Sequence, residues 1–206
     1  MTFCPRFVHW STWPGWMAPE TEGAPLTLAK GMLGGVLSKG GVSLRVVEVE
    51  AYGDAQDSAS HARFGRTNRT WPMFEAEGGL YVYLCYGIHW MVNVAAGPEG
   101  QGGAVLVRGA EVVRGRGLVR NRRGRDPSMA GALAGPGKVG QALAASKEDS
   151  GRRLGEGLWR FQRATTSPGS WRAGPRIGIG YAADKDQVRR WRLWLPSGQV
   201  SPCPRV

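Results

Sequence analysis

The residue types best suited to chemistry lie close together between Val46 and His61. Two carboxylates, Glu48 and Glu50, are followed by Tyr52 and, after a Gly/Asp/Ser-rich stretch, by His61. A strand has a period of two, so Glu48, Glu50 and Tyr52 share one of its faces. Acidic groups flanking an aromatic ring on one face are typical of a pocket wall. The alternative is an edge strand with a charged outer face.

A predicted β-hairpin supplies a second group of candidates. Segments 80–85 and 88–95 have the composition of strands, and Tyr86-Gly87 between them is typical of a tight turn. Tyr86 either folds back on its own hairpin or enters another molecule as a wedge, as apolar side chains enter base steps. Asn93 is polar within an otherwise apolar strand, so it needs hydrogen-bond partners there or in a ligand.

Arg108 ends a third apolar strand, 104–108. A buried arginine needs a carboxylate partner, and Glu48 or Glu50 could provide it. Either a site residue or a structural ion pair is consistent with this pattern.

The charge balance indicates a polyanionic partner. The 206 residues carry 27 Lys and Arg against 16 Asp and Glu, a net charge of +11 with a pI near 10.3, and only five of the cations are Lys. Arginine pairs bidentately with phosphate, which favours nucleic acid. A GC-rich genome would also favour Arg over Lys, but it explains the excess of positive charge less well.

Several of these cations are clustered. The long polar connection 53–79 carries Arg63, Arg66 and Arg69, which are three residues apart. These arginines either contact phosphates or belong to a solvated loop. Segment 110–125, predicted as a helix running into a basic loop, has six arginines. Lys138 lies near the start of a predicted helix, 135–146, where it could contact a phosphate.

Other classes of site find no support in the sequence. The three cysteines are widely spaced without CxxC, which argues against zinc and against a disulfide framework, and Cys85 is predicted as a small core residue. Segment 176–181 reads as a glycine-containing strand, and no phosphate-binding loop of the GxxxxGK[ST] type is present. No apolar run is long enough to span a bilayer and no signal peptide is evident, so we expect a cytoplasmic protein with no membrane partner.

Seven sequence blocks carry a resemblance to a known family. In order they are VEVEAY (47–52), SASHARFGRTNR (58–69), MF (73–74), GGLYVYLCYGIHWMVNV (78–94), AVLVRGAE (104–111), GPGKVGQAL (135–143) and PRIGIG (175–180). Together they resemble the alkyladenine (3-methyladenine) DNA glycosylases, over roughly residues 25–200. Departures from the family pattern occur at Thr70, Trp71 and Ile88, among the expected DNA contacts.

The resemblance implies a role for each matching residue. Glu50 would be the general base that activates water, and Arg108 would help to hold Glu50 and the water. An extruded base would stack between Tyr52 on one face and His61 and Tyr83 on the other. The remaining assignments are discrimination against the guanine 2-amino group by Asn93, intercalation by Tyr86, and DNA contacts by Arg66, Thr67, Arg69, Ile88, His89 and Lys138.

The resemblance also implies a fold and a function. The fold would be a single α+β domain (25–206, after an irregular extension, 1–24) with a curved, mostly antiparallel sheet, flanking helices and a protruding DNA-inserting β-hairpin. The protein would act as a monomer in the bacterial cytosol, without metal or cofactor. It would flip alkylated or deaminated purines out of double-stranded DNA and hydrolyse the N-glycosidic bond. From the residues alone, a non-catalytic nucleic-acid-binding module and a small-molecule hydrolase remain alternatives.

Overall fold

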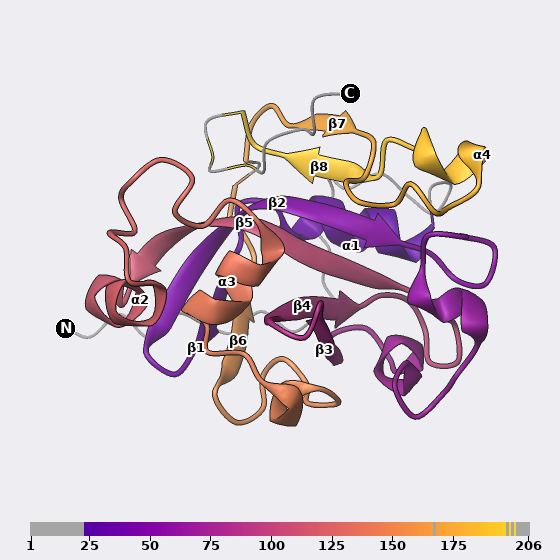
Figure 1. Cartoon of the computed structure of the whole chain (residues 1–206), viewed down its shortest axis with the longest axis horizontal. Helices are drawn as coiled ribbons and strands as arrows, with labels where there is room; N and C mark the ends of the chain where they lie inside the picture. Colours follow the sequence, from indigo (N-terminus) through magenta and orange to yellow (C-terminus); the bar gives the residue numbers. More distant parts are fainter. Residues whose placement is uncertain (1–22, 167, 197, 199, 201–206) are drawn as a thin grey trace.

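A curled antiparallel sheet of eight strands is the centre of the molecule (Figure 1). The structure is a computed structural model that describes residues 23–166, 168–196, 198 and 200. The irregular extension predicted for residues 1–24 falls almost wholly outside this part of the chain. Within it, four α-helices flank the sheet, which confirms the predicted α+β class.

Two long strands, β2 (Val42–Tyr52) and β5 (Ala104–Arg114), form the middle of the sheet. β5 follows one edge of β2, whereas β1 (Val36–Lys39) and then β8 (Arg192–Trp194) share the other edge. The β2–β5 register shifts on both sides of Glu48. Such irregularities increase local twist, so they help the sheet to curl around the site.

Glycines shape the connection from β1 to β2. Lys39 pairs with Val42, and the two residues between them, Gly40 and Gly41, have φ values of 51° and 86°. Two consecutive positive φ angles are what a type I′ hairpin turn requires. The predicted hairpin is therefore confirmed.

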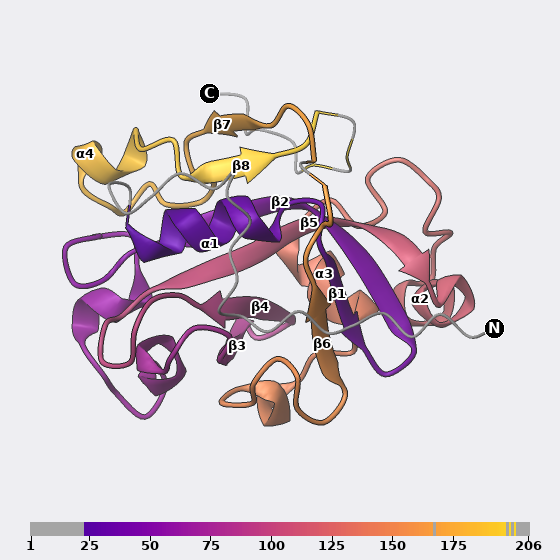
Figure 2. The ribbon, with the colours of Figure 1, turned by 180° about the vertical axis from the view of Figure 1, so that it is seen from behind.

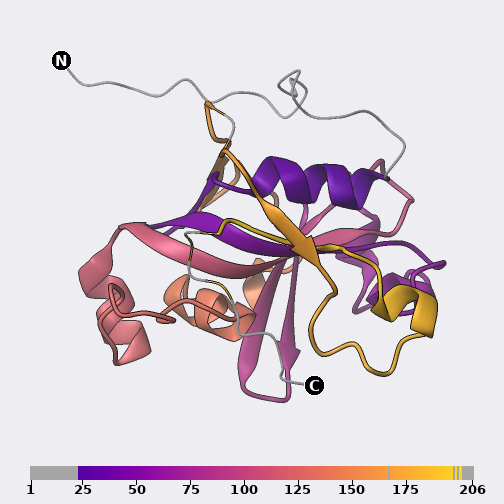
Figure 3. The same cartoon turned by 90° about the horizontal axis from the view of Figure 1, so that it is seen from above.

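β3 (Leu80–Cys85) and β4 (His89–Ala95) form the second predicted hairpin. β4 pairs with β5, which ties the hairpin to the main sheet. Its far end extends away from the sheet on the same side as α3 (Pro136–Ala142) (Figure 3).

Helices cover both faces of the central strands. α1 (Ala24–Met32) lies on one face (Figure 2), and α2 (Arg116–Arg123) and α3 lie on the other. α3 packs so closely on β4 that a Cβ at Gly140 would collide with the carbonyl oxygen of Trp90. The remaining elements are η1 (His61–Phe64), η2 (Trp71–Phe74), η3 (Lys147–Asp149), β6 (Trp159–Gln162), β7 (Arg172–Gly174) and α4 (Asp184–Gln187). Among the described helices, none has the length and apolar character needed to cross a membrane.

Three local predictions were wrong. Residues 110–114 continue β5 instead of starting a helix, because they pair with the first half of β2. Segment 176–181 forms no strand; Gly178 has a φ of 77°, and the chain is held by side-chain contacts with the loop after β2. Cys85 is half-buried near the hairpin tip and is not part of the core.

Candidate active site

A pocket of about 570 Å³ opens between β2, β5, the β3–β4 hairpin and two loops. Most of the predicted site residues line it, although they are far apart in sequence. The lining includes Tyr52, His61, Arg69, Tyr81, Tyr83, Tyr86, Asn93, Arg108 and Ile177. A volume of this size is typical of small-molecule or single-nucleotide sites.

Glu50 lies directly behind the pocket wall and is fully buried. Its Oε2 accepts hydrogen bonds from Arg108 Nη1 at 3.0 Å and from the Tyr52 hydroxyl at 2.8 Å. Its Oε1 accepts a third, at 2.7 Å, from the backbone N–H of Ile177. All three donors belong to residues that line the pocket, so the carboxylate is fixed in position next to it.

Opposing effects set the acidity of this carboxyl group. Burial raises the pKa of Glu50 above its ordinary value, and the Arg108 charge, the Ile177 N–H and the Tyr52 hydroxyl only partly offset the increase. A raised pKa makes a carboxylate a stronger base. Burial and the neighbouring Glu50 charge raise the pKa of Tyr52 as well, so its hydroxyl remains a hydrogen-bond donor.

Glu48 anchors the same cluster from behind. It is fully buried and lies 3.1 Å from Arg192 Nη1 and 3.5 Å from Arg108 Nε. The sequence left Glu48 and Glu50 as alternative partners of Arg108; the structure pairs Arg108 with both, and β8 contributes a second arginine. Removing one member of such a buried cluster leaves an uncompensated charge.

Aromatic side chains form the opposite wall. The rings of Tyr81 and Tyr83 stack with centroids 5.2 Å apart, and the His61 ring meets the Tyr83 ring edge-on at 4.8 Å. His61 Nδ1 lies 2.9 Å from the Tyr81 hydroxyl. Burial, reinforced by nearby Arg69 and Arg63, lowers the pKa of His61 to about 4, so its ring is neutral at physiological pH.

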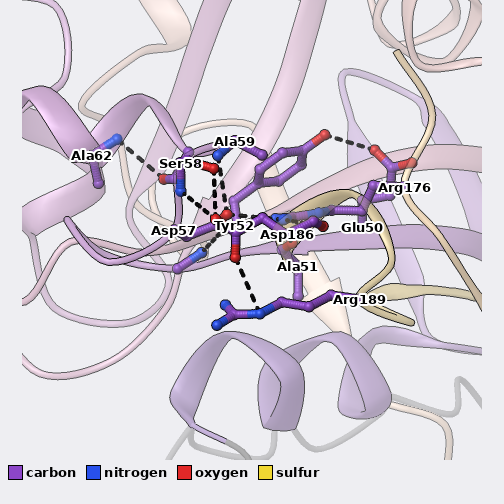
Figure 4. A network of polar contacts seen from close by, with 12 residues as sticks. Glu50, Ala51, Tyr52, Asp57, Ser58, Ala59, Ala62, Arg176, Asp186 and Arg189 are labelled. Atoms are coloured by element: carbon purple, nitrogen blue, oxygen red, sulfur yellow. Dashed lines mark hydrogen bonds and ion pairs between the residues drawn. The ribbon is translucent and has the colours of Figure 1, made fainter. Parts of the chain in front are cut away.

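A buried ion pair supports the Tyr52 side of the pocket. Arg176 binds Asp57 through two hydrogen bonds, of 2.6 and 2.8 Å, and donates a third to the carbonyl of Ala51. Its guanidinium lies 4.9 Å from the centre of the Tyr52 ring. Figure 4 shows this network together with the Tyr52–Glu50 hydrogen bond. Because Arg176 precedes Ile177, the ion pair also positions the amide that binds Glu50.

A second buried acid, Asp186, holds the loop after β2 at Ser58. Asp186, on α4, accepts hydrogen bonds from the Ser58 backbone N–H at 2.9 Å and from its hydroxyl at 2.5 Å. Arg189 lies 3.2 Å from the same carboxylate (Figure 4). α4 therefore fixes the segment that leads into His61.

Asn93 is buried on β4 among the lining residues. Its side-chain amide donates a hydrogen bond of 3.0 Å to the carbonyl of Tyr81. The hydrogen-bond partner that the sequence required for Asn93 is therefore present on the adjacent strand. This bond also orients the Asn93 side chain within the pocket.

The hairpin tip is exposed. Tyr86 is 90% exposed and has a φ of 50°, which is unusual for a bulky residue. It does not fold back into the core. Ile88 is 71% exposed, and the neighbouring His89 packs against Gly137 at the start of α3.

The other residues predicted to contact DNA have different surroundings. Arg66 forms an exposed ion pair of 3.0 Å with Glu75, whereas Arg69 lies over the Tyr83 ring and lines the pocket. Thr67 hydrogen-bonds with Thr70 inside its own loop. Lys138 donates to the carbonyl of Gly131 from the start of α3.

The structure thus brings together the two predicted catalytic residues and the four predicted pocket residues, namely Glu50, Arg108, Tyr52, His61, Tyr83 and Asn93. The residues missed from sequence are Asp57, Tyr81, Arg176 and the Ile177 amide; only Tyr81, on the same strand face as Tyr83, had a local signal. Among the described residues, no three His, Cys, Asp or Glu side chains form a group that could hold a metal ion.

Known proteins resemble this chain over most of its length. The family described as Methylpurine-DNA glycosylase (MPG) matches residues 20–199. A Nocardia farcinica protein provisionally named a 3-methyladenine DNA glycosylase is 46% identical, over 84% of each chain. A Nitrosococcus oceani protein of the same provisional name is 41% identical, over 86% of this chain and 88% of its own. The DNA-3-methyladenine glycosylase of Arabidopsis thaliana is 44% identical, over 82% of this chain and 66% of its own.

Proposed function

The chain belongs to the methylpurine-DNA glycosylase family, and from this premise we propose that it excises damaged purines from double-stranded DNA. Membership makes it a DNA-repair hydrolase of N-glycosyl bonds. The proposed substrates are alkylated purines such as 3-methyladenine and deaminated ones such as hypoxanthine. One observation carries the proposal: a buried carboxylate, Glu50, is held by three donors from residues that line an aromatic pocket.

Base flipping is the first step of the proposed mechanism. The bond to be cut is inaccessible inside a duplex, so the damaged nucleotide must leave the stack at a cost of a few kcal/mol. Tyr86 is exposed at the end of a hairpin beside the pocket, and it would fill the space that the nucleotide leaves.

Stacking would then select the base. The flipped purine would lie between Tyr52 and the pair formed by His61 and Tyr83. Cationic N-alkylpurines gain about 0.5–2 kcal/mol from electron-rich rings, and the neutral state of His61 avoids repulsion of such a base. Asn93 would discriminate against guanine, because guanine carries a 2-amino group at the position that Asn93 faces.

Hydrolysis follows from the position of Glu50. A water molecule held by Glu50 and Arg108 would attack C1′ of the sugar while the bond from C1′ to the purine nitrogen breaks. The bonding electrons leave with the base. They neutralise a cationic purine, whereas a neutral purine such as hypoxanthine takes up a proton from solvent as it leaves. The negative charge of Glu50 stabilises the oxocarbenium character of the sugar as it develops, and Glu50 then accepts the proton of the attacking water.

We further propose a monofunctional, monomeric enzyme that leaves an abasic site. A lyase reaction would need an amine nucleophile, and the described residues that line the pocket include no lysine. We place the protein in the compartment of its DNA substrate, the bacterial cytosol and nucleoid.

A base-release assay tests the proposal. Purified protein is incubated with duplexes that contain one 3-methyladenine, one hypoxanthine or no lesion, and free base and strand breaks are measured separately. We expect free base from the lesion duplexes, with strand cleavage only after alkali. DNA binding without base release would favour the non-catalytic module, and DNA affinity without salt dependence would favour a small-molecule hydrolase.

A further inference from the structure

A second hollow, of about 440 Å³, lies beside the base pocket. We call it the rim groove; it is lined by His61, Arg63, Phe64, Thr67, Arg69, Thr70 and Tyr181. Three of these residues, His61, Arg69 and Tyr181, also line the base pocket. The two hollows therefore adjoin each other along these three side chains, and the mechanism proposed above uses only the first.

Exposed aromatic rings in the rim groove are held in place. Phe64 is 66% exposed and Tyr181 is 60% exposed. The guanidinium of Arg63 lies 4.2 Å from the Phe64 ring centre and 5.2 Å from that of Tyr181. Arg63 in turn donates to the carbonyl of Ser58 at 2.7 Å, and the Tyr181 hydroxyl donates to the carbonyl of Ala59 at 2.9 Å. Two solvent-facing rings in contact with one hydrogen-bonded guanidinium form a stacking surface.

The rim groove is also electropositive. Arg63 and Arg69 are both in its lining, and their charges add to the effect of burial in lowering the pKa of His61. No acidic residue is among the described residues of this lining. A ligand with both a flat ring and a negative charge fits such a surface, and a nucleotide has both.

We infer that the rim groove binds the nucleotide next to the flipped purine on the same strand. Its base would stack on Phe64 and Tyr181, and its phosphate would lie near Arg69. This inference rests on the proposed function, because it takes the flipped nucleotide to occupy the adjoining pocket. A base can reach these rings only when it leaves the helical stack, so the site favours substrates in which the neighbouring base is unpaired.

Photocrosslinking locates the neighbouring base directly. The substrates are duplexes with a non-cleavable abasic analogue, flanked on one side or the other by 5-iodouracil, either mispaired or paired with adenine. After irradiation, mass spectrometry identifies the crosslinked residue. We expect one flanking position to crosslink to Phe64 or Tyr181, more strongly when it is mispaired.

Affinity measurements provide the matched test. Phe64→Ser should weaken binding of the mispaired duplex about tenfold and that of the paired duplex less, because stacking on one ring is lost. Leu158→Ser removes an apolar side chain of similar exposure, 65%, outside both hollows and should leave both affinities unchanged. Thermal unfolding of each variant checks that the fold is retained.

Crosslinks that avoid both aromatic residues, or equal affinities for wild type and Phe64→Ser, would overturn the inference. Base release by the wild-type protein is measured separately. If the protein releases damaged bases while the rim groove makes no crosslink, the inference fails and the proposed function stands. If no base is released from any lesion, the proposed function itself fails.

Discussion

The two sides of the pocket are built in opposite ways. On the Glu50 side, the charged groups are buried and bonded to one another across β2, β5, β8 and the segment around Arg176. On the hairpin and rim-groove side, large apolar residues such as Tyr86, Ile88 and Phe64 face solvent. The first arrangement holds a buried carboxylate in one position, whereas the second leaves apolar surface open to solvent, where the proposed function places the DNA.

This difference separates two kinds of proposed site residue. A substitution on the buried side should change stability and the acidity of Glu50 together, because each charge supports its neighbours. A substitution on the exposed side should change DNA binding and leave the fold intact. The predictions below test that separation.

Arg108→Gln should have the largest effect on stability. It leaves Glu48 and Glu50 buried side by side without their shared cation, at a cost of about 3–5 kcal/mol. The matched control is Arg45→Gln, which breaks a 3.3 Å ion pair with Glu111 whose side chains are about one-third exposed; it should cost at most about 1 kcal/mol. Urea unfolding measures both, and similar losses would contradict the account.

Asp57→Asn should have the next largest effect on stability, because Arg176 loses its buried counter-charge. We expect a loss of about 3 kcal/mol, near the lower end for breaking a buried pair, since Asn can still accept a hydrogen bond. The Ile177 N–H lowers the pKa of Glu50. Loosening that contact should therefore move the acid limb of the pH–rate profile to higher pH.

Asp149→Asn is the control for this shift. Asp149 is also buried and pairs with Lys39 at 2.5 Å, but it does not line the pocket. It should destabilise the fold without moving the acid limb. If both variants leave the limb in place, the Asp57–Arg176 pair has only a structural role.

Tyr86→Ala should reduce affinity for lesion-containing DNA about tenfold, the loss expected for one stacked ring. Its side chain is almost fully exposed, so the free energy of unfolding should change by less than about 0.5 kcal/mol. Fluorescence anisotropy and thermal unfolding measure the two quantities. Val188→Ala, at another exposed position, is the control, and a loss of stability in Tyr86→Ala alone would indicate a structural tyrosine.

Lys138→Gln should have the smallest effect, on the salt dependence of DNA binding. One lost phosphate contact reduces the slope of log affinity against log salt concentration by about 0.9. Lys30→Gln, on α1 across the sheet, should leave the slope unchanged. An unchanged slope for Lys138→Gln would remove Lys138 from the proposed DNA contacts.

Local sequence patterns predicted most of the strands. Alternating apolar residues and turn signals located both hairpins, and the family resemblance drawn from seven blocks was confirmed. The end of β5 was mistaken for a helix because its conformation depends on pairing with residues 43–46 of β2. Segment 176–181 was mistaken for a strand because the ion pair that holds it involves a residue 119 positions earlier.

The site was predictable only where side-chain type carries information. Glu50, Tyr52 and Arg108 were predicted to lie at one site, and the structure places them in hydrogen-bond contact. The Ile177 amide could not be found in the same way, because every residue except proline has a backbone N–H and the side chain gives no sign of its use. A backbone donor is visible only once the fold is known.

The central claim is that Glu50 is the base of the reaction, and single-turnover base release from a hypoxanthine or 3-methyladenine duplex tests it most directly. Glu50→Gln should slow base release by about 10²–10⁴-fold, as expected for the loss of a general base, with DNA affinity retained. In the wild-type protein the rate should fall with decreasing pH through a pKa above the ordinary carboxyl value. Full activity of Glu50→Gln, with the same pH profile as the wild type, would contradict the account.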